Sequence, residues 1–571
     1  MRPALQRGLP LKLSQLSGIT VLQSSFSQGT PSNRTSYIGI ATSFQKDSVL
    51  TSASASLAEA SSPSKRRKMG AVEGPLAGLE PANVWGFFHD ITKIPRPSKH
   101  EEKVLKWLKS FAEERGLAWQ QDTVGNLVIK RTGTGGGEEA PAVVIQGHVD
   151  MVTEKNNDVE HDFFKDPLCL QLDGTWLKAN GTTLGADNGI GVATALALLD
   201  LTPSAEHPMP PLECLFTVDE ETGLTGAFDL DASLLSGKTL LNLDTEDWGK
   251  IFIGCAGGGD SMITLPVQHT AISADKADAY TIKISGLMGG HSGLNINEDR
   301  GNAVRFVAQV ANAVLKAAPS ARLARISGGD KRNAIAREAS AQIVVPAGEA
   351  SAAAEAVNKQ SQALAQEYGA LEKQLDVSVG QSERRPPDQT LTPDSADQLL
   401  TLLLTLPHGV VKYSHTVPGL VETSSNLASV KPEGPEGSAP SAYKVNCSTR
   451  SSLLPALEQV RDSIARLSRL VGASVEQDTA YPGWAPNPDS AVVRLAQEVL
   501  TEVTGHKVKV GAIHAGLECG IILEKVPGMD AVSYGPTIKG AHSPDERVEI
   551  ATVAPFWEAT LKILGRLAAR R

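Results

Sequence analysis

Short apolar runs alternate with a helical segment between residues 142 and 247, and this alternation is the feature that most limits the fold. The strand-like runs are AVVIQGHVD (142–150), PLECLFTVDEE (211–221) and TLLNLDTED (239–247), and the apolar helical segment NGIGVATALALLDL (188–201) lies between the first two. Strands that alternate with helices form mostly parallel sheets covered by those helices. The pattern therefore predicts an α/β protein with a mostly parallel mixed sheet flanked by helices.

The chain has 571 residues, which is too long for one hydrophobic core. The glycine-rich segment GCAGGGD (254–260) is a candidate hinge, and strands and long amphipathic helices follow it in two rough halves. We therefore expect a disordered extension at 1–78, a main domain at 79–259, an inserted α+β lid domain at 260–478, and the completion of the main domain at 479–571.

Glycines also cluster in TGTGGG (132–137), for which a phosphate-binding loop is an alternative interpretation. A phosphate loop precedes a helix and carries Gly-Lys-Ser/Thr, whereas a strand follows this segment and that tripeptide is missing from it. We interpret the segment as a hairpin loop.

The first 68 residues are rich in Ser and Thr and contain nine Lys or Arg residues against only Asp47 and Glu59. This composition is typical of an organellar transit peptide, so we expect import into a plastid or a mitochondrion. An unstructured tail without an address is one alternative, and a nuclear signal at KRRK (65–68) is another. Met69 could serve as an internal start that yields a cytosolic form.

The remaining composition excludes several classes of function. A formal net charge of −10 with 41% hydrophobic residues describes a mildly acidic globular chain without a basic face for nucleic acid. No apolar run approaches the ~20 residues of a membrane span. The five cysteines are scattered without a C-x-x-C pair, which favours reduced thiols over a disulfide framework or a zinc ribbon.

The three apolar runs all end in His, Asp or Glu. His148 and Asp150 are two residues apart, so their side chains point to the same face beyond the strand. The carboxyl ends of strands are where open α/β sheets bind ligands. Each residue alone also has a plain structural explanation, since Asp187, for example, could simply cap the helix that follows it.

The coincidence of several such residues favours a metal site. Adjacent acids such as Glu220 and Glu221 repel each other, so burying them is costly unless a cation compensates. Histidines with carboxylates and no thiolates suit a catalytic site with Zn²⁺ or Mn²⁺ better than Ca²⁺ or a structural zinc. Two ions ~3.5–4 Å apart, joined by a bridging carboxylate, are the expected arrangement.

Six motifs carry a specific resemblance. The segments GHVDMV, LGADNGIG, DEETGLTGA, LNLDTED, GLMGGHSG and AHSPDERV resemble the metallopeptidase M20 family, most closely its aminoacyl-histidine dipeptidase branch, over residues 80 to 571. The resemblance implies a catalytic main domain that holds two divalent metal ions, with Zn²⁺ expected and Mn²⁺ or Co²⁺ as alternatives. It also implies a cis peptide bond between Asp187 and Asn188.

The resemblance further assigns roles to residues of the main domain. One metal would be held by His148, Asp187 and Asp244, and the other by Asp187, Glu221 and His542, so Asp187 would bridge. Glu220 would act as the general base and Asp150 would orient His148. We therefore expect these side chains to converge at the carboxyl edge of the sheet.

In the lid, the resemblance implies that His291 stabilises the oxyanion and that Asn426 and Arg450 bind substrate. Arg450 suits bidentate capture of a free C-terminal carboxylate, while Asn333 and Arg337 offer a rival pair. The length of the lid favours His291 acting within its own chain, with a homodimer through the lid as the alternative.

The expected function is hydrolysis of small unblocked dipeptides, including Xaa-His types, by a metallo-dipeptidase. A deacylase or aminoacylase of the same family, acting on N-acyl amino acids, is the second enzyme hypothesis. A catalytically silent relative that only binds peptide or metal is the third, but the adjacent Glu220 and Glu221 argue against it, because a binding module needs no general base.

The compartment can be tested directly. A fluorescent protein fused behind residues 1–78 should enter a plastid or a mitochondrion, because the segment has the basic, acid-poor composition of a transit peptide. A diffuse cytosolic signal would contradict this prediction.

Overall fold

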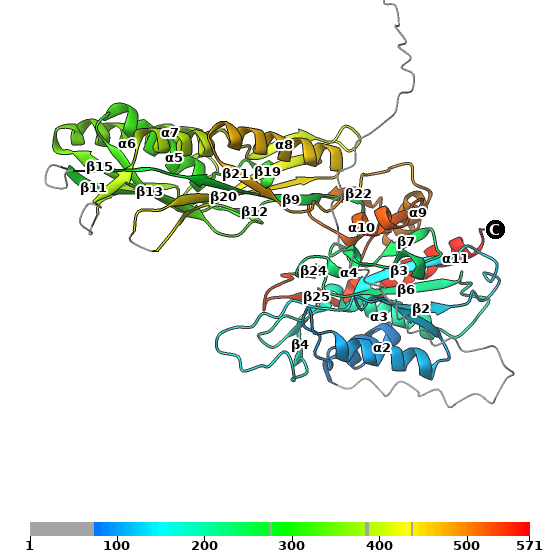
Figure 1. The fold of residues 1–571 in the computed structure, drawn as a ribbon. Coiled ribbons are helices and arrows are strands. Elements are labelled where there is room, and N and C mark those ends of the chain that lie inside the picture. The colour runs from blue at the N-terminus through cyan, green and yellow to red at the C-terminus, as the bar shows by residue number, and fades with distance from the viewer. Residues whose placement is uncertain (1–73, 273–276, 383–387, 436–437, 571) are drawn as a thin grey trace, which may run out of the picture. The chain divides into compact units, whose positions relative to one another are not determined.

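The computed structural model describes residues 74–272, 277–382, 388–435 and 438–570 (Figure 1). Most of the predicted extension, including its basic cluster, lies outside these residues, so import into an organelle stays a prediction. Within the described part of the chain, no helix is both long enough and apolar enough to cross a membrane. All five cysteines are free thiols, as their scattered spacing predicted.

The main domain is built on an eight-stranded mixed sheet in the order β1-β2-β6-β3-β7-β23-β8-β22. In chain order its strands are β1 (Ala118–Gln121), β2 (Leu127–Arg131), β3 (Val143–His148), β6 (Leu212–Thr217), β7 (Thr239–Asn242), β8 (Lys250–Cys255), β22 (Lys509–Ile513) and β23 (Asp530–Ser533). β3 runs parallel to both β6 and β7, and β7 runs parallel to β23, so the centre of the sheet is parallel. The predicted fold class is confirmed.

The apolar character of the central elements follows from their place in the fold. Every residue of β3 and of β6 is buried, as expected for parallel strands that are covered on both faces. Helix α3 (Ala186–Asp200) packs between β3 and helix α1 (Ala82–Ile91), so it is apolar on nearly all sides. Helices α9 (Ala491–Thr504) and α10 (Glu518–Lys525) pack on β8 and β23, and α11 (Ile550–Ala568) packs on α9.

The glycine-rich segment at 132–137 is not a hairpin loop, and that interpretation is wrong. It joins β2 to β3, but β6 lies between these two strands in the sheet, so they do not pair with each other. β6 follows later in the chain, and nothing in the local sequence indicates that it inserts there.

The second large sheet has the strand order β16-β11-β15-β13-β19-β20-β9-β21, with β18 also paired to β19. In chain order its strands are β9 (Gly257–Pro266), β11 (Ala277–Ser285), β13 (Arg322–Gly329), β15 (Ala339–Pro346), β16 (Asp376–Gln381), β18 (Gly409–Tyr413), β19 (Val421–Glu433), β20 (Ala442–Ser451) and β21 (Ser474–Gln477). The two halves expected from the sequence meet where β13 pairs with β19, at Gly328 and Gly329. They therefore share one continuous sheet.

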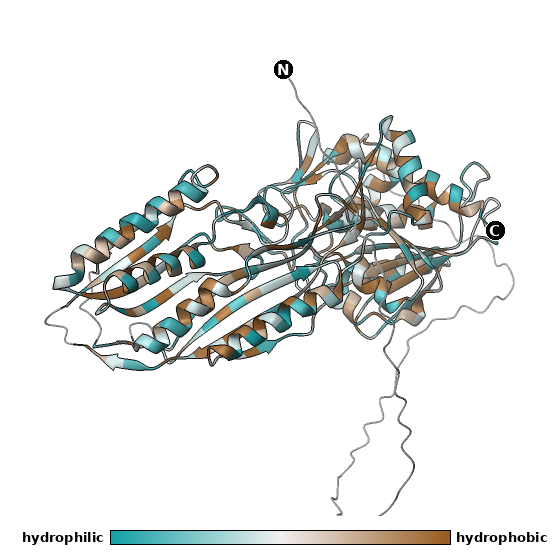
Figure 2. Ribbon diagram, turned by 90° about the horizontal axis from the view of Figure 1, so that it is seen from above, coloured by the Kyte–Doolittle hydropathy of each residue, from teal (hydrophilic) through white to brown (hydrophobic). Residues whose placement is uncertain are grey.

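Four long helices cover one face of this second sheet (Figure 1). They are α5 (Ala303–Ala317), α6 (Ala350–Tyr368), α7 (Pro393–Thr405) and α8 (Leu454–Leu470). Figure 2 shows hydrophilic and hydrophobic residues alternating along these helices, which is the pattern of helices with one face against a sheet.

The chain passes between the two sheets at the glycine-rich segment predicted to be a hinge. β8 ends at Cys255 and β9 begins at Gly257, and the returning chain pairs with this crossing through Cys255–Trp484 and Gly258–Tyr481 bridges. A Cβ on Gly257 would collide with the carbonyl oxygen of Tyr481, so the close approach of the two chains requires glycine there. The predicted domain boundaries at 259/260 and 478/479 themselves stay predictions.

Two small sheets complete the surroundings of the site. β4 (Leu170–Asp173), β5 (Trp176–Ala179), β25 (Arg547–Glu549) and β24 (Ile538–Lys539) form the first, so the C-terminal hairpin pairs with a strand that shortly precedes α3. β12 (Gly290–His291) and β14 (Ala334–Ile335) form the second.

Candidate metal centre

Five predicted ligands come from five separate segments. His148 is the last residue of β3, Glu221 follows the end of β6, and Asp244 follows the end of β7. Asp187 lies at the start of α3, where regular helical backbone begins only after Asn188, and His542 lies in the turn between β24 and β25. Because β3, β6 and β7 are parallel neighbours, their carboxyl ends reach the same edge of the sheet.

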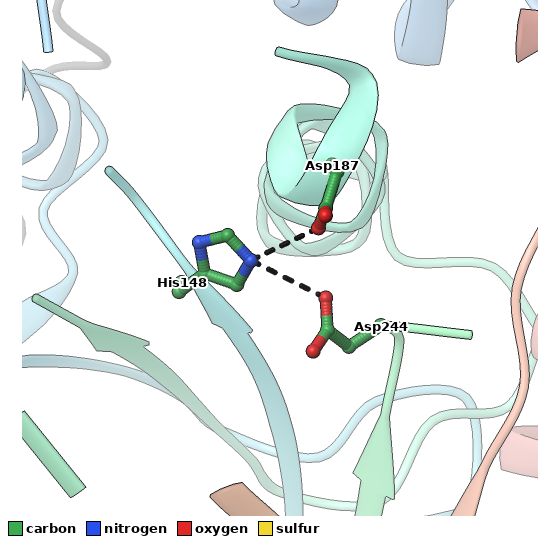
Figure 3. A group of neighbouring side chains, drawn as sticks. All are labelled: His148, Asp187 and Asp244. Atoms are coloured by element: carbon green, nitrogen blue, oxygen red, sulfur yellow. Dashed lines mark hydrogen bonds and ion pairs between the residues drawn. The ribbon is translucent and has the colours of Figure 1, made fainter. Parts of the chain in front are cut away.

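The first group consists of His148, Asp187 and Asp244 (Figure 3). The Nε2 atom of His148 lies 3.1 Å from Oδ1 of Asp187 and 3.4 Å from Oδ1 of Asp244. Figure 3 shows the imidazole directed at both carboxylates. The three ligand atoms lie within 4.8 Å of one another, so one cation could contact all three.

The second group consists of Asp187, Glu221 and His542, whose ligand atoms also lie within 4.8 Å of one another. The Nε2 atom of His542 is 3.3 Å from Oδ2 of Asp187 and 2.9 Å from Oε2 of Glu221. Asp187 thus presents one carboxylate oxygen to each group. This sharing is the geometry expected of a carboxylate that bridges two metal ions.

Asp150 is fully buried behind His148. Its Oδ1 lies 3.4 Å from Nδ1 of His148, and its oxygens accept hydrogen bonds from the backbone N–H groups of Glu220 and Glu221 and from the Ser98 hydroxyl. Asp150 therefore orients the imidazole and holds the acidic loop at the same time. The sequence did not indicate the contribution of Ser98.

The electrostatics of the site show how crowded its carboxylates are. Burial raises the pKa of Glu220 well above its usual range, and the negative charges of Asp244 and Glu221 add to this effect. Burial, together with the negative charges of Asp187 and Glu221, also raises the pKa of Asp244 to about 6. Burial alone would lower the pKa of His148, but its carboxylate neighbours outweigh burial and raise that pKa.

The donor set fits a pair of divalent cations. Oδ1 of Asp244 is buried, and apart from the ion-pair contact with Nε2 of His148 at 3.4 Å it receives no hydrogen bond from the residues that the structure describes. A buried anionic oxygen without a donor is costly, and a cation at this position would compensate its charge. The imidazole and carboxylate ligands without thiolates suit Zn²⁺, Mn²⁺ or Co²⁺.

A buried polar network that sequence reasoning missed lies behind the ligands. Glu518 of α10 is fully buried and accepts hydrogen bonds from Nε2 of Gln146 (2.6 Å) and from the Thr217 hydroxyl (2.8 Å). The Gln146 side chain in turn accepts a hydrogen bond from Nδ2 of Asn242 (2.5 Å). The network ties together the ends of β6, β3 and β7, each of which leads into a predicted ligand.

In the lid, the contacts of His291 define its protonation. Its Nδ1 accepts hydrogen bonds from the backbone N–H groups of Gly293 (3.2 Å) and Leu294 (3.0 Å), so the proton of the neutral ring resides on Nε2. Burial, together with the positive charges of Arg450 and His542, lowers the pKa of His291 to about 4. His291 is therefore a neutral imidazole with an Nε2–H group to donate.

The other predicted lid residues differ in the hydrogen bonds that they already make within the protein. Nη1 of Arg450 on β20 contacts the Tyr481 hydroxyl at 3.4 Å. Asn426 is buried, and its amide nitrogen donates to the carbonyl oxygens of Arg332 and Ala334, so its donor is already engaged within the lid. Asn333, from the rival pair, is exposed next to Ser292, whose N–H donates to its carbonyl oxygen (2.8 Å). The substrate-binding roles of these residues stay predictions.

The peptide bond between Asp187 and Asn188 is cis, as the resemblance predicted. The other peptide bond in the cis form within the described residues precedes a proline, at Glu80–Pro81. The side chain of Asn188 donates to the carbonyl oxygen of Leu243, next to Asp244.

The chain is similar to known peptidases over most of its length. Residues 144–566 match the model of peptidase family M20/M25/M40. The chain is 39% identical over 502 residues to the cytosol non-specific dipeptidase of Escherichia coli, which covers 87% of this chain and 99% of that relative. The solved structure of aminoacylhistidine dipeptidase from Vibrio alginolyticus is 40% identical, with a TM-score of 0.77 over 86% of this chain and 98% of that one.

A more distant structure shares only the fold. Aminopeptidase PepT from Bacillus cereus aligns with a TM-score of 0.54 at 14% identity, over 86% of this chain and 99% of that one. The family match and the identity to the two closer relatives extend over most of the described residues. The chain belongs to peptidase family M20/M25/M40.

Proposed function

We propose that this protein is a metal-dependent dipeptidase that hydrolyses the peptide bond of small unblocked dipeptides, including Xaa-His types. One observation carries the proposal: two groups of candidate metal ligands share Asp187, and the carboxylate of Glu220, next to the candidate ligand Glu221, lies close to both Glu221 and His148. Two relatives at 39% and 40% identity, a non-specific dipeptidase and an aminoacylhistidine dipeptidase, support the substrate class.

His148, Asp187 and Asp244 would hold one divalent ion, and Asp187, Glu221 and His542 the other. Bound there, the two ions would polarise the scissile carbonyl. They would also lower the pKa of the attacking water toward neutral pH. Zn²⁺ is the expected ion, with Mn²⁺ and Co²⁺ as alternatives.

Glu220 is the general base of this proposal. A ligand atom of its carboxylate lies within 4.8 Å of those of His148 and Glu221, and it belongs to neither of the two proposed ligand sets. Its raised pKa suits a group that accepts a proton and then releases it. Glu220 takes a proton from the attacking water and delivers it to the departing amine.

Two lid residues complete the proposal. The Nε2–H group of His291 donates a hydrogen bond to the oxygen that becomes negative in the transition state, because Nδ1 is occupied by two backbone donors. Arg450, steadied by Tyr481, receives the C-terminal carboxylate of the dipeptide. A free carboxylate is common to dipeptides and N-acyl amino acids, so only the amine end separates the two substrate classes.

The substrate class is tested by comparing Ala-His, carnosine and N-acetyl amino acids at equal concentration. We expect hydrolysis of the unblocked dipeptides, complete loss of activity after dialysis against a chelator, and recovery when Zn²⁺ or Mn²⁺ is added back. The metal-free protein should also unfold at a lower temperature, because a ligand that binds only the folded state stabilises it. Preferential cleavage of the N-acetyl amino acids would favour the deacylase alternative.

The roles of the two adjacent acids should separate on substitution. Glu220→Ala and Glu220→Gln should keep the metal content of the wild type while kcat falls by ~10²- to 10⁴-fold with little change in KM, because only the proton acceptor is removed. Glu221→Ala should lose metal, since it removes a ligand. Metal analysis beside dipeptide hydrolysis is the measurement, and loss of metal from Glu220→Ala alone would show that the roles are exchanged.

His291→Ala should lower kcat by ~10²- to 10³-fold, as expected for removal of one oxyanion donor, with metal content unchanged. Because the pKa of His291 is about 4, its ring stays neutral above about pH 5. Protonation of His291 should therefore not reduce the activity of the wild type above that pH. Substitution of His415, an exposed lid histidine, by Ala is the matched control. Equal activity of both variants would exclude His291 from the reaction.

A further inference from the structure

Glu546 is a buried carboxylate that accepts hydrogen bonds from four consecutive backbone N–H groups. Its side chain is buried, with the residue only 2% exposed. Oε2 accepts from Leu184 (2.8 Å) and Gly185 (2.9 Å), and Oε1 accepts from Ala186 (2.7 Å) and Asp187 (3.2 Å). Both oxygens are thus used, and their partners are the residues that lead into the shared ligand Asp187.

This contact joins two segments that are far apart in the sequence. Glu546 follows His542 by four residues, and the strand after it, β25, pairs with β5 through Arg547–Lys178 and Val548–Leu177. The segment that carries His542 is therefore joined at two places to the residues that lead into Asp187, by the pairing of β25 with β5 and by the Glu546 carboxylate.

Arg96 binds a backbone carbonyl oxygen of the same loop. The guanidinium is buried, and it donates to the carbonyl oxygens of Val149 (2.9 Å), Asp150 (2.7 Å) and Gly185 (2.5 Å). A Cβ on Gly185 would collide with the guanidinium, and the φ of 65° at this residue also favours glycine. Two charged side chains consequently fix this loop: Glu546 binds its backbone N–H groups and Arg96 binds one of its carbonyl oxygens.

We propose that Glu546 is a positioning residue that sets the distance between Asp187 and His542, and that it thereby controls the affinity of the second metal site. The inference rests on the proposed function, because it needs those two residues to be ligands. Glu546 belongs to neither proposed set of metal ligands. It acts through the backbone of residues 184–187.

The chemistry of a carboxylate is required at this position. Four N–H donors converge on two oxygens, and an anionic acceptor makes stronger hydrogen bonds than a neutral one. An amide has one oxygen and one NH₂ group, so Glu546→Gln would turn a donor toward two of the four N–H groups. Glu546→Asp keeps the charge but is one methylene shorter, so it cannot reach all four donors from the same backbone position.

The experiment compares the wild type with Glu546→Gln, Glu546→Asp and the matched control Glu549→Gln. Glu549 lies three residues further along the same segment and is half-buried. For each purified, chelator-treated protein, calorimetric titration with Zn²⁺ or Mn²⁺ measures the number of ions and their dissociation constants. Circular dichroism and thermal unfolding of the metal-free proteins report on folding separately.

We expect two ions in the wild type and in Glu549→Gln. In Glu546→Gln one of the two ions should bind about 10- to 100-fold more weakly, the range typical of residues that orient metal ligands. Glu546→Asp should show a smaller loss at the same site. Activity of both Glu546 variants should recover with excess metal, because the catalytic groups are intact.

The outcomes that contradict the inference are distinct from those that contradict the proposed function. If the wild type binds two ions and Glu546→Gln binds both with unchanged constants, the inference is overturned, even when its metal-free form melts at a lower temperature. If Glu546→Gln does not fold, the same comparison is made with Glu546→Asp, and unchanged dissociation constants for both ions in that variant overturn the inference. A wild type that binds no metal would overturn the proposed function and this inference with it.

Discussion

The mutual repulsion of buried carboxylates is the constraint on which this site depends. Asp187, Glu221, Asp244 and Glu220 gather around His148 and His542 at one edge of the sheet, and burial together with neighbouring negative charges raises the pKa of Glu220 and of Asp244. Such a cluster is costly for a folded chain unless cations compensate it. The arrangement of the sheet, the helix start at Asp187 and the C-terminal hairpin can be understood as the means of bringing these groups together.

A second layer of buried polar side chains holds the segments that carry the proposed ligands in place. Asp150 binds the imidazole of His148 and the backbone of Glu220 and Glu221, while Glu518 connects Gln146 and Thr217 at the ends of β3 and β6. Both oxygens of Asp150 and Oε2 of Glu518 accept hydrogen bonds, which offsets the cost of burying them, whereas Oε1 of Glu518 receives none from the described residues. Strand ends and loops, which are otherwise free to move, are thereby fixed relative to one another.

Much of the site could be predicted from residues and spacing. Apolar runs that end in His148, Glu221 and Asp244 indicated parallel strands with their carboxyl ends at one edge, and the structure brings these residues together. The residues that hold them were not predicted, because Gln146 and Asn242 interrupt strands without any local sign of a partner. The orientation of Asn426 was likewise hidden, since its donor is engaged by backbone carbonyls of a segment nearly a hundred positions earlier.

The sequence by itself determined the fold class, the family and the residue types available to the site, because hydrophobic periodicity and strand-end residues are local properties of the chain. Only the tertiary structure decided the strand order, which places β6 between β2 and β3, so the segment expected to be a hairpin loop joins two strands that do not pair. It alone also showed that Glu546 and Arg96 hold the loop before Asp187 from opposite sides. The physical reason is that a hydrogen bond between residues 89 positions apart, as for Arg96 and Gly185, or 360 positions apart, as for Glu546 and Ala186, leaves no periodic pattern in the sequence and exists only once the chain has folded.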